Sequence, residues 1–250
     1  MIDPEQPAEQ PAEQPAEQPE PLFWGYQDLA VFVCLALPCF LLGIGIVKGV
    51  LAAAPVLRAG KALELLAGQF LGYALWFGCL VALFRTRYGK PFWPAMNWKL
   101  SSGEIVPSLS LGLVLAIVVA VIGLLLRTPP ADSTLLELMK DRASIIAVAF
   151  FATTLGPFFE ELVFRGFLLP LLVRSVGAAA GIILTALPFA LLHGPQYHWS
   201  WQHMVLLSGV GCMFGWARYK TGSTGIPTVM HAGYNATFMA GFILSKGEYF

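Results

Sequence analysis

Two adjacent carboxylates and an arginine stand out in a long apolar part of this chain. Glu160 and Glu161 are followed by Arg165 at the end of an apolar run that begins near Ile145. At the depth of a lipid bilayer an ionised side chain is opposed by roughly 3 kcal/mol or more, so such groups usually face a wet cavity and carry function. We therefore expect these acids to form the acid/base centre of an enzyme that works inside the membrane.

The spacing of these three residues separates the two acids. Residues four apart share one face of a helix, so Glu161 and Arg165 can form an ion pair, whereas Glu160 points about 100° away. One carboxylate is then structural, and the other is free for chemistry. The alternative is that both acids belong to a paired surface cluster at the end of a helix.

Polar groups recur on two later apolar segments. His193 ends the run 189–193, and His231 and Asn235 lie four residues apart, so that an imidazole and an amide share a helix face. Any one of them alone suggests an interhelical hydrogen bond of about 1 kcal/mol. Three helices that each bring polar groups to a near-terminal position, in a chain with few other such groups, instead predict a common site.

These groups together are suited to amide hydrolysis. A carboxylate kept from bulk water has a raised pKa and can act as a general base, and a neighbouring histidine can share the proton and orient the attacking water. A second histidine and an asparagine amide can supply donors for the oxyanion of a tetrahedral intermediate. The serines lack a Gly-x-Ser-x-Gly sequence and the cysteines lack polar neighbours, so nothing indicates a covalent nucleophile.

A metal ion is the competing mechanism. Two histidines and a glutamate are the ligand set of a catalytic zinc site with an open fourth position, so Glu160, His193 and His231 would be the ligands. The sequence has no His-Glu-x-x-His motif that would make this choice specific. His198 and His203 are weaker candidates, because they lie in and just after a tryptophan-containing loop that we interpret as an interfacial cap.

Composition predicts a membrane protein. Hydrophobic residues make up 57% of the 250 and charged residues only 12%, about half the charged share of an ordinary soluble domain. The formal net charge is zero, so there is no basic footprint for nucleic acid, and the expected partners are lipid and a membrane-associated substrate. The four cysteines form no CxxC pair and are interpreted as packing residues.

The chain divides into a tail and one membrane domain. Residues 1–21 repeat Pro-Ala-Glu-Gln and are expected to be disordered. Residues 22–250 are expected to form an all-α, multi-pass transmembrane bundle of about seven or eight helices around a central polar cavity. The apolar stretches are Leu29–Val47, Leu66–Phe84, Val106–Leu126, Ile145 to the Glu160 region, Gly166–Val173 as a short separate piece, Ala178–Leu192, Met204–Tyr219 and Ile226–Leu244.

The order of the three motifs resembles a known family. Glu160-Glu161-x-x-x-Arg165, Phe189-x-x-x-His193 and His231-x-x-x-Asn235, within 143–244, are similar to the motifs of the CAAX prenyl protease and bacteriocin-processing (CPBP, Abi) intramembrane proteases. The resemblance implies a helical bundle that cleaves a membrane-associated, prenylated or lipid-anchored peptide. It also implies that Glu160 activates water together with His193, and that Glu161 and Arg165 hold the Glu160 carboxylate in place. His231 with Asn235 would then stabilise the oxyanion. The short chain looks most like bacterial members, which implies an inner-membrane location.

The sequence therefore predicts a multi-pass intramembrane endopeptidase, either glutamate-dependent or metal-dependent. Two alternatives come from other classes of protein. A non-catalytic scaffold or bacteriocin-immunity protein would keep the fold without turnover. A small transporter would also place ionisable groups at depth in the membrane.

Overall fold

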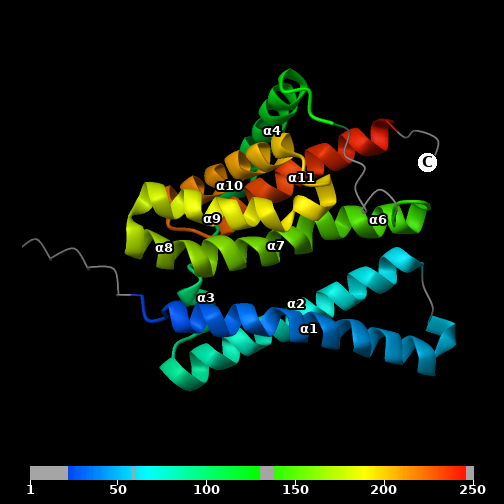
Figure 1. Ribbon diagram of the computed structural model, residues 1–250, viewed down its shortest axis with the longest axis horizontal. Helices are drawn as coiled ribbons and strands as arrows, with labels where there is room; N and C mark the ends of the chain where they lie inside the picture. Colours follow the sequence, from blue (N-terminus) through cyan, green and yellow to red (C-terminus); the bar gives the residue numbers. More distant parts are fainter. Residues whose placement is uncertain (1–21, 58–59, 130–137, 246–250) are drawn as a thin grey trace, which may run out of the picture.

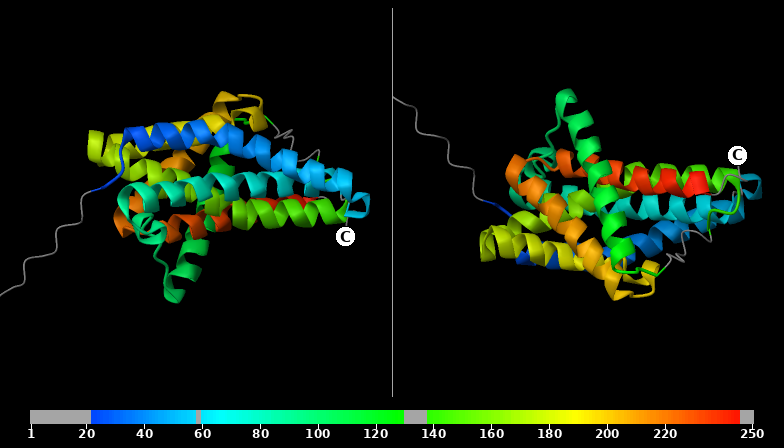
Figure 2. Two further views of the ribbon diagram at one scale, coloured as in Figure 1. Left: turned by 90° about the horizontal axis from the view of Figure 1, so that it is seen from below. Right: turned by 90° about the horizontal axis from the view of Figure 1, so that it is seen from above.

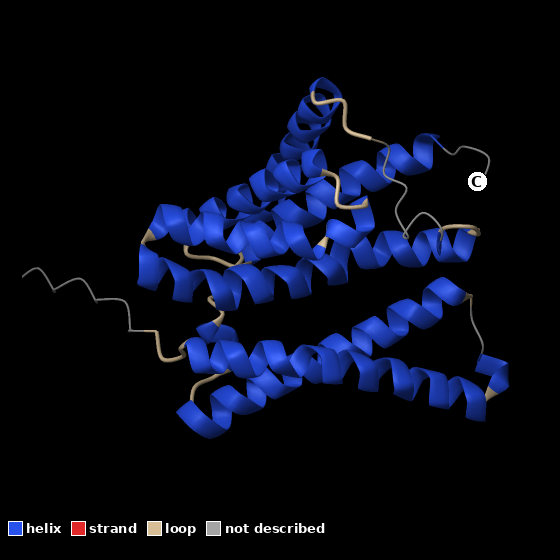
Figure 3. Cartoon of the chain, viewed as in Figure 1, coloured by secondary structure: helices blue, strands red, loops and turns tan. Residues whose placement is uncertain are grey.

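The described chain is entirely helices and loops. The computed structural model describes residues 22–57, 60–129 and 138–245, and within these ranges it contains no strand (Figure 3). The expected all-α bundle is confirmed. The proposed tail, residues 1–21, lies outside the described residues.

Helices α1 (Tyr26–Ala53) and α2 (Lys61–Tyr88) form a pair at one side of the molecule (Figure 1). They are joined through the short helix η1 (Pro55–Leu57). The two helices cross closely at Gly43, where an added Cβ would lie 2.6 Å from the backbone nitrogen of Gly72. Beside the crossing, the rings of Phe32 and Trp76 stack at 4.1 Å. Small residues at the crossing thus let the two helices approach closely, so that aromatic rings of both helices can stack.

A single long helix carries the acidic motif. It runs from Arg142 to Val176 through α6 (Arg142–Phe150), η2 (Phe151–Leu155), α7 (Gly156–Glu161), η3 (Leu162–Leu168) and α8 (Leu169–Val176). The expected separate piece at Gly166–Val173 is wrong, because this segment continues the same helix. Both η2 and η3 are π-helical turns, and each directly precedes the segment that contains Pro157 or Pro170. A wider turn accommodates a proline, which lacks a backbone donor and clashes with the preceding turn of an α-helix.

The remaining helices complete the bundle around α7. They are α3 (Phe92–Ala95), α4 (Ser102–Leu125), α9 (Ala178–Leu192), η4 (Gly194–Tyr197), α10 (Trp201–Thr221) and α11 (Gly225–Ser245). Helix α9 lies between α8 and α10, and α4 crosses α11. The crossing is tight, since a Cβ on Gly233 would lie 2.6 Å from the carbonyl oxygen of Leu109. In the views of Figure 2, α4 extends beyond the rest of the bundle.

The chain is an integral membrane protein. Among the described residues, four helices are long and apolar enough to cross a membrane: Tyr26–Ala53, Lys61–Tyr88, Ser102–Leu125 and Arg142–Val176. They correspond to the first four stretches expected from hydropathy, the third of which ends one residue beyond its helix. Large apolar side chains such as Leu37, Val114 and Leu124 remain exposed on them. Exposed apolar faces of this extent are stable in contact with lipid rather than water.

Candidate active site

A fully buried ion pair lies at the centre of the site. Nη1 of Arg165 donates to Oε1 of Glu161 across 2.7 Å, and both side chains are completely shielded. Nη2 of Arg165 donates to the carbonyl oxygen of Gly211 on α10, at 2.8 Å. The expected pair between Glu161 and Arg165 is therefore present, and it also ties the long helix to α10.

Three aromatic rings enclose the guanidinium group. The Cζ atom of Arg165 lies 4.7 Å from the ring centroid of Phe189, 5.4 Å from that of Phe214 and 5.7 Å from that of Phe164. The faces of aromatic rings attract cations, and the attraction grows when water is excluded. These rings offset part of the cost of burying the arginine, a contribution that the sequence motifs did not reveal.

His231 is oriented by the second acid. Its Nδ1 atom lies 2.9 Å from Oε1 of Glu161, the same oxygen that accepts from Arg165. Its imidazole stacks on Phe214 with ring centroids 4.7 Å apart. Because a carboxylate only accepts hydrogen bonds, Nδ1 carries the proton and the Nε2 edge turns toward Glu160. Glu161 thus orients an imidazole in addition to pairing with the arginine.

His193 faces the same carboxylate from the other side. Its Nδ1 atom lies 2.8 Å from the carbonyl oxygen of Phe189, so Nδ1 donates and Nε2 is left toward the cavity. Nε2 of His193 and Nε2 of His231 each lie 3.9 Å from Oε2 of Glu160. That oxygen is buried and has no hydrogen-bond partner among the described residues. Glu160, His193 and His231 therefore meet, as the motif analysis expected.

Asn235 lies beside this group but is already engaged. Its Nδ2 atom donates to the carbonyl oxygen of Ala152 at 2.8 Å. Ala152 belongs to the π-helical turn η2, whose wider turn leaves backbone carbonyls outside the regular α-helical pattern. One N–H of the amide is consequently used to hold α11 against the long helix. The local sequence around Asn235 did not predict this contact.

One family model matches the part of the chain that contains these residues. The family described as type II CAAX prenyl endopeptidase, Rce1-like, matches residues 142–237. The matched range begins with α6, ends within α11 and contains all six motif residues. This part of the chain is similar to the CAAX protease family. Comparisons with curated proteins and with solved structures found no match.

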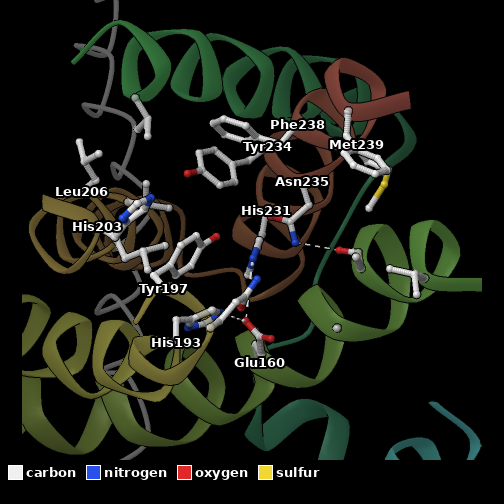
Figure 4. A pocket seen from close by; sticks show the side chains of 18 of the residues that line it. Glu160, His193, Tyr197, His203, Leu206, His231, Tyr234, Asn235, Phe238 and Met239 are labelled. Atoms are coloured by element: carbon white, nitrogen blue, oxygen red, sulfur yellow. Dashed lines mark hydrogen bonds and ion pairs between the residues drawn. The ribbon is translucent and has the colours of Figure 1, made fainter. Parts of the chain in front are cut away.

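The group of Glu160, His193 and His231 borders a cavity of about 660 Å³, part of which is drawn in Figure 4. Glu160, His193 and His231 line one part of it, and α2 and α4, which lie outside the matched range, supply other walls. The apolar residues of the lining include Leu66, Val119, Ala120, Leu124, Leu206, Leu207, Val210, Phe238, Met239 and Phe242. The cavity therefore joins a group of polar side chains to a space suited to an apolar chain.

Two tyrosines on the cavity wall are additions that the motifs did not predict. Tyr197 comes from η4 and Tyr234 from α11, next to Asn235. The expected interfacial loop also contributes more than a cap, because His203 lines the cavity and stacks on Tyr197 at 4.4 Å. Trp199 and Trp201 are more than half exposed, as residues at a membrane surface often are.

The three groups expected as zinc ligands are spaced too widely for a tetrahedral ion. Ligands about 2.05 Å from zinc lie about 3.3 Å from one another. Each imidazole Nε2 is instead 3.9 Å from Oε2 of Glu160. Among the described residues, no group of three or more His, Cys, Asp or Glu side chains has a geometry that could hold a metal ion. In the described residues, Glu160, His193 and His231 as they stand therefore do not have the spacing of a tetrahedral zinc site.

Proposed function

We propose that this protein is an intramembrane endopeptidase that hydrolyses a peptide bond in a membrane-associated, lipid-anchored peptide or protein, with water activated by Glu160. One observation carries the proposal. A buried carboxylate oxygen without a hydrogen-bond partner faces two imidazole Nε2 atoms at 3.9 Å and borders a large cavity. The match to CAAX prenyl endopeptidases supports the same reaction class.

The 3.9 Å separations suit a bridging water. They are too long for direct hydrogen bonds, yet one water can contact both atoms of such a pair. Glu160 takes a proton from this water as its oxygen attacks the peptide carbonyl, and His193 Nε2 accepts a hydrogen bond from the same water. Collapse of the tetrahedral intermediate breaks the C–N bond, and Glu160 returns the proton to the leaving nitrogen. The products are a carboxylic acid and an amine.

Glu161 and Arg165 act as positioning residues in this mechanism. The guanidinium fixes Glu161, and Glu161 fixes the tautomer and orientation of His231. An imidazole held by a carboxylate keeps one orientation through turnover, as in other acid/base sites. The pair is fully buried, so we assign it no direct contact with the substrate.

The shape and lining of the cavity support a lipid-modified substrate. Its catalytic end is polar, and the walls from α4, α10 and α11 are predominantly apolar. An apolar substituent on the substrate would leave lipid for a similarly apolar surface, while the peptide bond reaches Glu160. We place the protein in a bacterial inner membrane, in keeping with the resemblance to bacterial members of the family.

The proposal is tested with purified protein in proteoliposomes. A quenched fluorescent peptide that carries a farnesylated CAAX end is expected to be cut, with the new ends identified by mass spectrometry. Comparative proteomics of membranes with and without the protein should show an accumulated precursor in its absence. Intact peptide together with an unchanged membrane proteome would overturn the proposal in favour of a scaffold or immunity protein. Solute flux without cleavage would indicate a transporter.

Removal of metal ions is expected to leave peptide cleavage largely unchanged. Because the three polar groups are too far apart for tetrahedral zinc, cleavage should remain within about twofold after treatment with a chelator and removal of metal by gel filtration. Metal content is measured on the same sample by mass spectrometry. The metal-independent mechanism would be contradicted if the protein contained stoichiometric zinc and lost activity together with that zinc. In that case His193→Ala should also remove the zinc.

A further inference from the structure

Arg218 is a buried arginine without an acidic partner. It lies in the last turn of α10, and only 8% of the residue is exposed. Among the described residues, no carboxylate pairs with it and no aromatic ring covers its guanidinium group. Arg165, which is also buried, has both kinds of partner. A charge removed from water is costly unless an opposite charge offsets the cost, so an anion is expected beside Arg218.

Thr224 holds the guanidinium group of Arg218 in one orientation. Nε of Arg218 donates to Oγ1 of Thr224 at 3.1 Å, and Oγ1 of Thr224 donates in turn to the carbonyl oxygen of Met96 at 2.6 Å. The backbone N–H of Thr224 donates to the carbonyl oxygen of Asn97 at 3.0 Å. These bonds join the turn between α10 and α11 to the loop between α3 and α4, and Arg218 is fixed at this junction.

The outer edge of the guanidinium group can reach a ligand. Nη1 and Nη2 of Arg218 make no hydrogen bond to a described residue, and neither nitrogen is sealed from the exterior. Because Nε is engaged by Thr224, these two nitrogens form the edge that is left for binding. They can donate two parallel hydrogen bonds, a geometry that matches two oxygens of one oxyanion.

The junction lies at a level where a membrane surface is expected. Trp216 and Tyr219 on α10 are each 50% exposed, and so is Trp93 on α3. Tryptophan and tyrosine rings concentrate at the depth of lipid headgroups. The oxyanion that is present throughout this layer is the phosphate group of phospholipids, so a phosphate is the ligand that fits the free edge of Arg218.

Two lysines add positive charge at the junction. Lys220 lies two residues after Arg218, and the carbonyl oxygen of Lys99 accepts a hydrogen bond from Oγ of Ser223. Both lysines are exposed. Helices α10 and α11 contain no acid, and the acid of α4, Glu104, is engaged as a cap of its own helix. Basic residues near a membrane surface attract anionic lipids, so the junction favours an anionic headgroup over a zwitterionic one.

We propose that this junction binds the phosphate group of an anionic phospholipid, with Nη1 and Nη2 of Arg218 donating to two phosphate oxygens. Lys99 and Lys220 attract the headgroup, and the bond to Thr224 keeps the guanidinium group in place before the lipid binds. This lipid site is separate from Glu160 and the two imidazoles, and it does not depend on peptide cleavage.

The test measures lipid binding to the purified full-length protein in detergent, by native mass spectrometry and by thermal unfolding. Phosphatidylglycerol is the anionic probe, phosphatidylcholine the zwitterionic probe, and inorganic phosphate the free ion. We expect phosphatidylglycerol to bind at least about fivefold more tightly than phosphatidylcholine. It should raise Tm by about 4 °C at ten times its dissociation constant. Inorganic phosphate at the same concentration should leave Tm unchanged.

Two variants of Arg218 separate a shaped site from general positive charge. Arg218→Gln should weaken phosphatidylglycerol binding about tenfold or more, because charge-assisted hydrogen bonds to phosphate are lost. Arg218→Lys keeps the charge but loses the planar pair of donors, so its binding should still be about threefold weaker or more. Arg85→Gln, which removes an exposed cation from the last turn of α2, is the matched control and should bind as tightly as the wild type.

Four outcomes would contradict the lipid site. Equal affinity of the wild type for the two lipids would overturn it, and so would equal weakening by Arg85→Gln and Arg218→Gln. Inorganic phosphate that raises Tm as much as the lipid does would overturn the assignment to a lipid. If Arg218→Gln does not fold, Arg218→Lys decides, because wild-type affinity in that variant would show that charge alone attracts the lipid.

Discussion

Replacing Glu160 with glutamine is expected to lower kcat for peptide cleavage by about a thousandfold, because glutamine cannot accept a proton from water. The side chain is 25% exposed and makes no direct hydrogen bond through Oε2. An isosteric, uncharged replacement should therefore leave the fold intact. The measurement is single-turnover cleavage of the fluorescent peptide in proteoliposomes, together with thermal unfolding in detergent.

A matched control is available on α4. Glu104 accepts from the backbone N–H of Ser101 at 2.7 Å and caps the helix. Glutamine preserves this type of cap. The residue lies about 22 Å along the helix from the cavity-lining residue Val119, at 1.5 Å per residue. Glu104→Gln should therefore cleave at the wild-type rate. Retention of even a tenth of the activity by Glu160→Gln would show that another group activates the water.

Replacing Arg165 with methionine is expected to destabilise the protein by about 4 kcal/mol, since it leaves the carboxylate of Glu161 buried without its cation. Such a loss corresponds to a drop in Tm of about 10 °C for a chain of this size. Methionine retains contact with Phe189 and Phe214, so the effect of lost packing is kept small. Thermal unfolding in detergent measures the change. Arg85→Met, at an exposed position, should shift stability by no more than about 0.5 kcal/mol.

A double variant separates the charge effect from the catalytic effect. Glu161→Gln combined with Arg165→Met removes both charges, so most of the lost Tm should return, because no unpaired ion remains buried. Activity should stay low even so, since His231 no longer has a carboxylate at Nδ1. A Tm for Arg165→Met equal to that of the wild type would contradict the structural role of the pair. Full activity in the double variant would contradict the positioning role of Glu161.

Several features of the site could be read from local spacing. The pair of Glu161 and Arg165 depends only on the helical repeat, and it forms as expected. The separation of Glu160 from that pair follows from the same repeat. The hydropathy of the first four apolar stretches was sufficient to locate the long helices. These features were predictable because each depends on neighbours within one helix.

Contacts between helices were less accessible to sequence reasoning. Glu161 was expected to pair with the arginine, and its oxygen also contacts His231, seventy residues further along the chain. Asn235 was expected to donate to the oxyanion, which stays a prediction, and its contact with the Ala152 carbonyl of a π-helical turn was not foreseen. The separate segment at Gly166–Val173 was wrong because wider turns allow one helix to continue through two prolines.

The sequence by itself determined that this is a helical membrane protein and which six polar residues its motifs contain. The tertiary structure decided which atoms face one another: the two imidazole edges toward Glu160, the aromatic rings around Arg165, and the two tyrosines on the cavity wall. The physical reason is that a membrane helix is apolar toward both lipid and protein, so its pattern of hydrophobicity fixes neither its rotation nor its depth. Close packing at small residues such as Gly233 fixes both.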